Sequence, residues 1–122
     1  MKKKLLSIIT ALSVFGSMSV AYAADIYYVS VVKNNWDTTS VVYGKDAYGR
    51  YAVTVNKGGA KATLLEKCSD NIWWEKHDID IYSTTSNSSY QDYWMKNSCQ
   101  YRVELQGQDV EKAEAYVKNN TN

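Results

Sequence analysis

Apolar and polar residues alternate with a period of two over much of the chain, as they do in half-buried β-strands. Residues 77–82 show this most strictly, because Ile79 and Ile81 share one side and Asp78 and Asp80 share the other. The same alternation, or a run of β-branched and aromatic residues, predicts further strands over residues 25–32, 38–43, 50–55, 61–68, 72–75 and 99–105.

Glycine and small polar residues between these stretches predict reversals of the chain. Residues 44–49, with two glycines, predict a turn that joins the strands on either side into a hairpin. Asn56-Lys57-Gly58-Gly59 predicts the strongest turn, so residues 61–68 are interpreted as the returning strand and not as a short helix. The run Ser-Thr-Thr-Ser-Asn-Ser-Ser at residues 83–89 predicts an exposed loop.

The spacing of apolar residues changes near the C-terminus. Asp109 is a good helix N-cap, and Val110, Ala113 and Val117 recur at helical spacing behind it. The sequence therefore predicts a short C-terminal helix that packs on the sheet. The expected fold class is α+β, mainly an antiparallel β-sheet or partly open barrel with one short C-terminal helix and one disulfide.

The first 23 residues have the organisation of a secretory signal peptide. Lys2-Lys3-Lys4 forms a basic start, residues 5–20 are mostly apolar, and Ala21-Tyr22-Ala23 supplies the small residues of a cleavage site. A membrane anchor is the alternative, but the apolar run is short for a bilayer span of about 20 residues. We expect residues 24–122 to form a single small β-rich domain, periplasmic or secreted, with no stable membrane insertion after cleavage.

The charge of the mature chain bears on its partners. Three of the 14 basic residues lie in the leader, which leaves 11 against 13 acidic residues and a net charge of −2. A domain with this slight negative charge offers no electrostatic attraction for nucleic acid or an anionic membrane, so neither partner is expected.

Cys68 and Cys99 are the two cysteines of the chain, and cysteines of exported proteins usually pair. Their spacing excludes a Cys-x-x-Cys redox motif, and with a single histidine the chain has too few ligands for zinc. No glycine-rich nucleotide motif is present. We therefore expect a Cys68–Cys99 disulfide, no metal and no other cofactor.

His77 is the only histidine, and it stands beside Asp78. Adjacent residues of a strand point to opposite faces, so the pair is poorly placed for acid–base chemistry, and no Gly-x-Ser-x-Gly turn supplies a nucleophile. Asp78 and Asp80 share a face, as a glycosidase pair or calcium ligands would. They lie along one strand, however, and no calcium loop is present. We interpret them as a solvated strand face and expect no catalytic residue.

The aromatic residues are the best functional signal. The only phenylalanine lies in the leader, whereas residues 24–122 hold ten tyrosines and all four tryptophans. Tyrosine and tryptophan favour half-buried positions and interfaces. The alternative is that these rings fill the core in place of phenylalanine. The predicted binding residues are Trp74, from the Trp73-Trp74 pair, and Tyr90, Tyr93 and Trp94, which follow the polar run at 83–89.

These observations favour a non-enzymatic binding protein that engages a protein partner, in the manner of an inhibitor or immunity protein, through exposed tyrosine and tryptophan. Flat rings also stack on sugars, so a glycan-binding module or toxin binding subunit is one alternative. A small secreted hydrolase or toxin that uses His77 is another. Periplasmic inhibitors, immunity proteins and toxin binding subunits share the layout of a signal peptide and a small disulfide-bonded β-domain.

Overall fold

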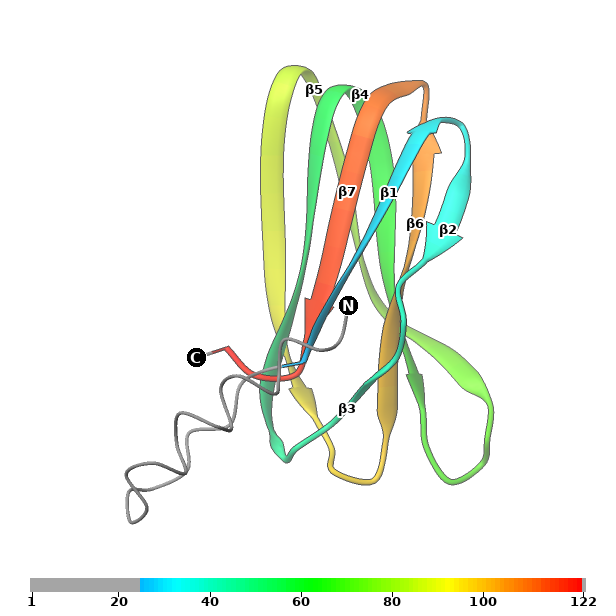
Figure 1. The fold of residues 1–122 in the computed structure, drawn as a ribbon, viewed down its shortest axis with the longest axis vertical. Coiled ribbons are helices and arrows are strands. Elements are labelled where there is room, and N and C mark those ends of the chain that lie inside the picture. The colour runs from blue at the N-terminus through cyan, green and yellow to red at the C-terminus, as the bar shows by residue number, and fades with distance from the viewer. Residues whose placement is uncertain (1–24, 122) are drawn as a thin grey trace, which may run out of the picture.

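A computed structural model describes residues 25–121, and the predicted signal peptide lies outside this range. No helix that could cross a membrane is found in this range. Residues 25–121 form seven antiparallel strands and no helix (Figure 1). The strands are β1 Ile26–Lys33, β2 Trp36–Thr38, β3 Val42–Tyr43, β4 Ala47–Lys67, β5 Trp73–Met95, β6 Gln100–Gln108 and β7 Val110–Lys118.

The long strand β4 organises the sheet. One of its edges pairs with β5 along almost its whole length. Its other edge pairs with β7 over residues 50–56 and with β6 over residues 59–67. Beyond these, β1 pairs with β7, while β2 and β3 both pair with β6, which gives the order β1-β7-β4-β6-β2.

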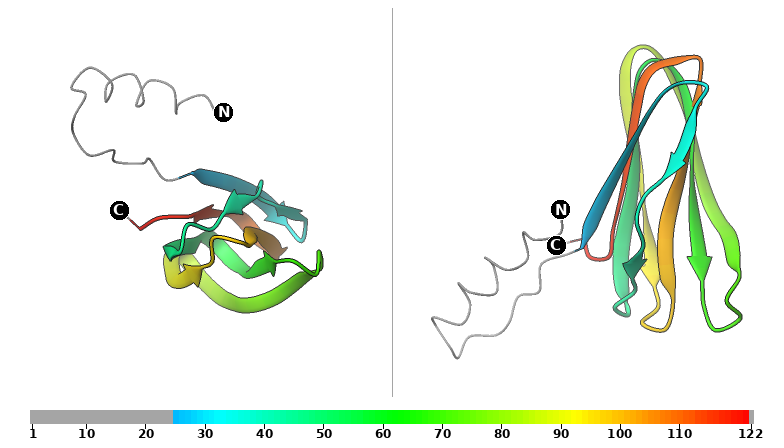
Figure 2. Two further views of the ribbon diagram at one scale, coloured as in Figure 1. Left: turned by 90° about the horizontal axis from the view of Figure 1, so that it is seen from below. Right: turned by 45° about the vertical axis from the view of Figure 1, so that its right-hand side comes forward.

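The strands bend over at one end of the molecule, the top in Figure 1. There β4 and β5 continue across, while β1 joins β2 and β6 joins β7 (Figure 2, right). We call this end the apex. One layer, the β1 layer, holds β1, β7, the first half of β4 and the last half of β5. The β2 layer holds β2, β3, β6, the second half of β4 and the first half of β5. The result is a flattened, nearly closed antiparallel barrel.

The core lies between the two layers and follows the period of two that the sequence predicts. The β1 layer contributes Val29, Val31, Tyr51, Val53, Val55, Met95, Ala113, Ala115 and Val117, and the β2 layer contributes Val42, Ala60, Ala62, Leu64, Ile81, Tyr101, Val103 and Leu105. Tyr51 and Tyr101 are the largest of the fully buried side chains. Tyrosine therefore takes the place of phenylalanine at these two positions.

The predicted C-terminal helix is wrong, because residues 110–118 form strand β7. The register between β1 and β7 shifts where Val31 pairs with Ala113 but Lys33 pairs with Val110. This irregularity separates Val110 and Ala113 by three residues, which resembles a helical spacing. From Ala113 to Val117 the buried residues alternate as in any half-buried strand. The α+β fold class is therefore replaced by an all-β one.

The turn predicted at residues 56–59 is a bend of β4 across the apex and not a reversal. Lys57 and Gly58 have φ angles of 52° and 141°, and the register with β5 shifts between residues 56 and 58. Lys33 and Asp109, at two other apex crossings, also have positive φ, at 57° and 53°. The residues that predict a turn at 56–59 therefore lie where strand β4 bends and continues.

Two further predictions of connections are wrong. The loop expected at 83–89 lies within strand β5, although most of its side chains are exposed as predicted. The hairpin expected across residues 44–49 does not form, because Val42 and Tyr43 pair with β6 and not with β4. Gly49 already belongs to β4, where a Cβ would lie 2.4 Å from the Met95 sulfur.

Candidate binding surface

The outer face of the β1 layer carries a row of aromatic rings. Tyr28 pairs with Tyr116, Tyr116 with Ala52, and Ala52 with Tyr90 across four strands. Residues paired in this way share a face, so the four side chains form one row across the sheet. The Tyr28 and Tyr116 rings lie 5.6 Å apart, and the Tyr90 side chain is 58% exposed.

A second pair of rings extends this row toward the end opposite the apex. Tyr48 pairs with Trp94, and their rings meet edge to face at 5.2 Å. Trp94 is 46% exposed. We call the five residues Tyr28, Tyr48, Tyr90, Trp94 and Tyr116 the aromatic face. The sequence pattern predicted Tyr90 and Trp94 as binding residues but not the other three, because only the pairing of distant strands brings the five together.

An ion pair is set among these rings. The Arg50 Nε donates to Asp92 Oδ1 at 2.6 Å, and its Nη2 donates to Oδ2 at 3.3 Å. The Arg50 Cζ also lies 4.0 Å from the centre of the Tyr90 ring. The hydrogen bond to Arg50 lowers the pKa of Asp92 and raises the pKa of Arg50. A surface pair contributes little to stability, so its main effect is to fix the guanidinium beside Tyr90.

The outer face of the β2 layer differs in character. Lys61 and Asp78 form an ion pair at 3.7 Å, and Asp80 is exposed on the same face. Trp73 is half-buried there, with the guanidinium of Arg102 4.4 Å from its ring centre. This face is mainly charged and solvated. The strands of this layer also expose four rings, but no ring contact among residues 25–121 joins any two of them; they are Trp36, Tyr43, Trp74 and Tyr82.

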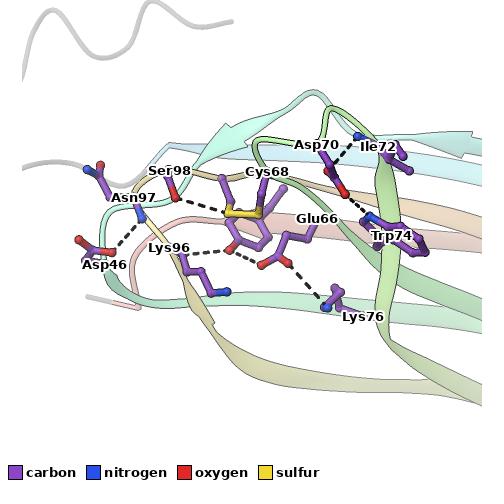
Figure 3. Close-up of a disulfide and its surroundings, with 12 residues drawn as sticks. Asp46, Glu66, Cys68, Asp70, Ile72, Trp74, Lys76, Lys96, Asn97 and Ser98 are labelled. Atoms are coloured by element: carbon purple, nitrogen blue, oxygen red, sulfur yellow. Dashed lines mark hydrogen bonds and ion pairs between the residues drawn. A yellow bond between two sulfur atoms is a disulfide. The ribbon is translucent and has the colours of Figure 1, made fainter.

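The other two predicted binding residues lie away from the aromatic face. Tyr93 points inward from β5, is half-buried and packs 6.2 Å from the Tyr101 ring. Trp74 lies near the start of β5, where its Nε1 donates to Asp70 Oδ2 at 2.8 Å (Figure 3). The four predicted residues therefore do not form one cluster, and Tyr90 and Trp94 are the two that lie together.

His77 contacts the edge of the core. Its Nδ1 shares a hydrogen bond with the hydroxyl of Tyr51, which is fully buried. None of the hydrogen bonds or ion pairs of residues 25–121 joins His77 to a carboxylate. The imidazole nitrogen that faces the protein is thus occupied by a core tyrosine.

The Cys68–Cys99 disulfide is confirmed and joins the end of β4 to the beginning of β6. Beside it, the Tyr101 hydroxyl donates to the buried Glu66 carboxylate at 2.6 Å, and the Lys76 Nζ lies 3.8 Å from the same group (Figure 3). Glu66 and the two sulfurs are close enough to share a metal ion, but disulfide sulfurs offer no thiolate. The disulfide indicates an oxidising environment.

Comparison with known proteins adds little to this geometry. No protein-family model matches the sequence, and no curated protein matches it significantly. Among solved structures, a mitogen derived from Yersinia pseudotuberculosis aligns with a TM-score of 0.49 at 12% identity, over 79% of this chain and 83% of the mitogen.

Two further structures align less closely. Murine APRIL has a TM-score of 0.39 at 11% identity, over 77% of this chain and 99% of its own. TmCBM61, in complex with beta-1,4-galactotriose, has a TM-score of 0.41 at 9% identity, over 75% of this chain and 65% of its own. Likenesses at this level carry no functional argument, so function is argued from the residues of the chain itself.

The two buried tyrosines predict a loss of stability in alkali. Burial raises the pKa of Tyr51, and burial together with the hydrogen bond to Glu66 raises the pKa of Tyr101. The stability contributed by a neutral buried phenol is complete below the unfolded pKa of about 10 and is lost as the pH rises above it. We expect the free energy of unfolding to fall steeply above about pH 10.

Phenolate absorbance measured alongside circular dichroism checks this expectation. The exposed tyrosines should ionise with the fold intact, and Tyr51 and Tyr101 should ionise only as the protein unfolds. The variant Tyr51→Phe should flatten the alkaline fall, whereas Tyr82→Phe, at a side chain that is 67% exposed, should leave it unchanged. Ionisation of every tyrosine while the sheet signal persists would contradict the prediction.

Proposed function

We propose that this protein is an exported, non-enzymatic binding protein, periplasmic or secreted, that engages a protein partner through the aromatic face. The single observation that carries the proposal is the gathering of five partly exposed rings on one outer sheet face around the fixed guanidinium of Arg50.

The chemistry of this face supports a protein partner. Tyrosine, tryptophan and arginine are the residues that most often dominate the energy of protein interfaces. The rings lie on paired strands, four of them contact a neighbouring ring and Tyr90 contacts Arg50, so little conformational freedom is lost when a partner covers them. Arg50 and Asp92 supply charge-assisted hydrogen-bonding groups between the rings.

The alternative of a hydrolase based on His77 receives less support. Its Nδ1 contacts the buried Tyr51 hydroxyl, and no carboxylate of the described residues orients the ring. A general base needs a partner that fixes its tautomer and a reacting group within reach. The arrangement around His77 favours a structural role.

Alanine substitutions on the two outer faces test the proposal. We expect Tyr90→Ala and Trp94→Ala each to weaken partner binding about tenfold or more, because truncating a ring at the centre of an interface costs more than 1 kcal/mol. The measurement is affinity capture from the medium and cell envelope of the producing cell, followed by titration of the captured protein.

The matched control is Tyr82→Ala, which removes an exposed tyrosine from β5 outside the aromatic face. It should bind as the unmodified protein does. A partner that is captured equally well by Tyr90→Ala, Trp94→Ala and Tyr82→Ala would show that the aromatic face is not the binding surface.

A further inference from the structure

A groove lies at the turn between β1 and β2. Its lining residues come from β1, the turn, β2 and β7, and they are Ser30, Val31, Val32, Asn34, Asn35, Trp36, Asp37 and Lys112. None of the five residues of the aromatic face takes part in it. The groove is therefore a separate candidate site.

The main chain of this turn is held firmly. The Asn34 side chain bonds Asp109 twice, since its Oδ1 accepts from the Asp109 amide at 2.9 Å and its Nδ2 donates to the Asp109 carboxylate at 3.4 Å. The Asn35 carbonyl accepts from the Gly107 amide at 2.9 Å. The β1–β2 turn is thereby fastened to the β6–β7 turn, so the groove is formed before any ligand arrives.

Asn34 and Asp37 are hydrogen-bonded within the protein, Asn34 to Asp109 and Asp37 Oδ1 to the Thr38 amide at 2.8 Å, whereas other groove side chains are not. Trp36 is 63% exposed. Among the hydrogen bonds of residues 25–121, none involves the Trp36 indole nitrogen or the side chains of Ser30 and Asn35. In addition, β1 pairs with β7 alone, so the peptide groups along its groove-side edge have no strand partner. A held turn with free polar groups near an exposed indole offers groups for contact with a small polar ligand.

The charges and hydrogen-bonding groups of the groove select the ligand. Asp37 and Lys112 have opposite charges, so the groove as a whole favours neither an anion nor a cation. Ser30 and Asn35 can each donate and accept hydrogen bonds, as a sugar hydroxyl also does. The indole offers a flat apolar surface to the C–H face of a sugar ring.

We propose that the β1–β2 groove binds a neutral saccharide, with one sugar ring stacked on Trp36 and its hydroxyls bonded to Asn35, Ser30 and Asp37. This site does not rest on the proposed protein-binding function, because the two sites share no residue. It gives the protein a second binding activity, directed at uncharged glycans.

A glycan array of neutral and anionic saccharides, probed with the whole folded protein, tests the proposal. We expect reproducible binding to one or more neutral saccharides. Titration of the best of them, followed by isothermal calorimetry, should show affinity about tenfold or more weaker for Trp36→Ala, and weaker for Asn35→Ala. Both side chains face solvent, so the midpoint of thermal unfolding should stay unchanged.

The control variant is Trp94→Ala, which removes an indole from the aromatic face and should bind the same saccharide with unchanged affinity. If Trp94→Ala loses the protein partner but still binds the saccharide, the groove and the aromatic face act independently. Binding of anionic glycans alone, no binding at all, or equal saccharide affinity for Trp36→Ala would each overturn the proposal. Loss of saccharide binding in Trp94→Ala would also overturn it, because the sugar would then lie on the aromatic face.

Discussion

Replacing Cys68 and Cys99 with alanine is expected to lower the free energy of unfolding by about 3–4 kcal/mol and to loosen strand β5 before the rest of the sheet. The disulfide spans a sequence separation of 31 residues, and the loop it closes contains the whole of β5. In the chain-entropy model, releasing a loop of this size returns that much conformational freedom to the unfolded chain. For a domain of this length the change is a large part of the total stability.

The early loosening of β5 follows from how this strand is held. In the sheet of residues 25–121, β5 pairs with β4 alone, whereas β4, β6 and β7 each pair with more than one strand. Ile81 and Met95 are the only buried residues in its length of 23, so few core contacts oppose its separation. Beyond those contacts and the ladder with β4, the disulfide joins the segments that precede and follow β5.

Hydrogen exchange followed by mass spectrometry measures the effect strand by strand. Amides of β5 should exchange faster in the double variant than in the unmodified protein, with a smaller change in β6 and β7. Alanine is chosen because Cys99 is 1% exposed, and a serine hydroxyl there would be buried. Reductant should reproduce the pattern in the unmodified protein and have no effect on the variant. An equal increase in amide exchange rate in all strands would contradict the prediction that β5 loosens first.

Much of the strand content follows from local sequence patterns. Alternation over residues 99–105 placed Cys99, Tyr101, Val103 and Leu105 inward, and all four are buried. The disulfide followed from the cysteine usage of a chain with a predicted signal peptide, and it is present. These features depend on near neighbours in sequence or on the chemistry of a single residue type, so they could be read without the fold.

The connections between strands could not be predicted from local sequence in the same way. The same residue types serve where a strand bends and where the chain reverses into a hairpin. Positive φ at Lys57 and Gly58 is compatible with a tight turn and equally with a strand that bends across the apex. Which one forms depends on pairing with β5, β6 and β7, which lie far along the chain. The tertiary pairing overrode the local preference.

The aromatic face illustrates the same limit. Each strand shows on its own which residues share a side, so Tyr90 and Trp94 were already on one face of β5. Tyr28 and Tyr116 come from opposite ends of the chain, and only the order β1-β7-β4-β5 carries their rings to the same surface. A binding surface made by sheet order is therefore invisible to spacing alone.

The apex makes a second strong prediction, because Gly58 is the residue at which β4 bends. We expect Gly58→Ala to lower the free energy of unfolding by about 2–3 kcal/mol. Its φ of 141° is one that residues with a side chain rarely adopt. A Cβ would also lie 2.4 Å from the Asp109 carbonyl oxygen and from the Val110 Cα. These are main-chain atoms of the β6–β7 turn, so they cannot rotate away as a side chain could.

Gly59→Ala is the matched control, since it adds the same methyl group one residue further along β4. There the nearest atom to a new Cβ is the Gln108 side-chain oxygen at 3.1 Å, which can rotate away, and the next is the Ile81 carbonyl oxygen at 3.3 Å. The expected cost is under about 1 kcal/mol. Urea unfolding of both variants measures the difference, with equal slopes required for the comparison. Equal losses of stability at the two positions would show that Gly58 is not needed for the close approach of the β6–β7 turn to β4, and that the apex tolerates a side chain at its bend.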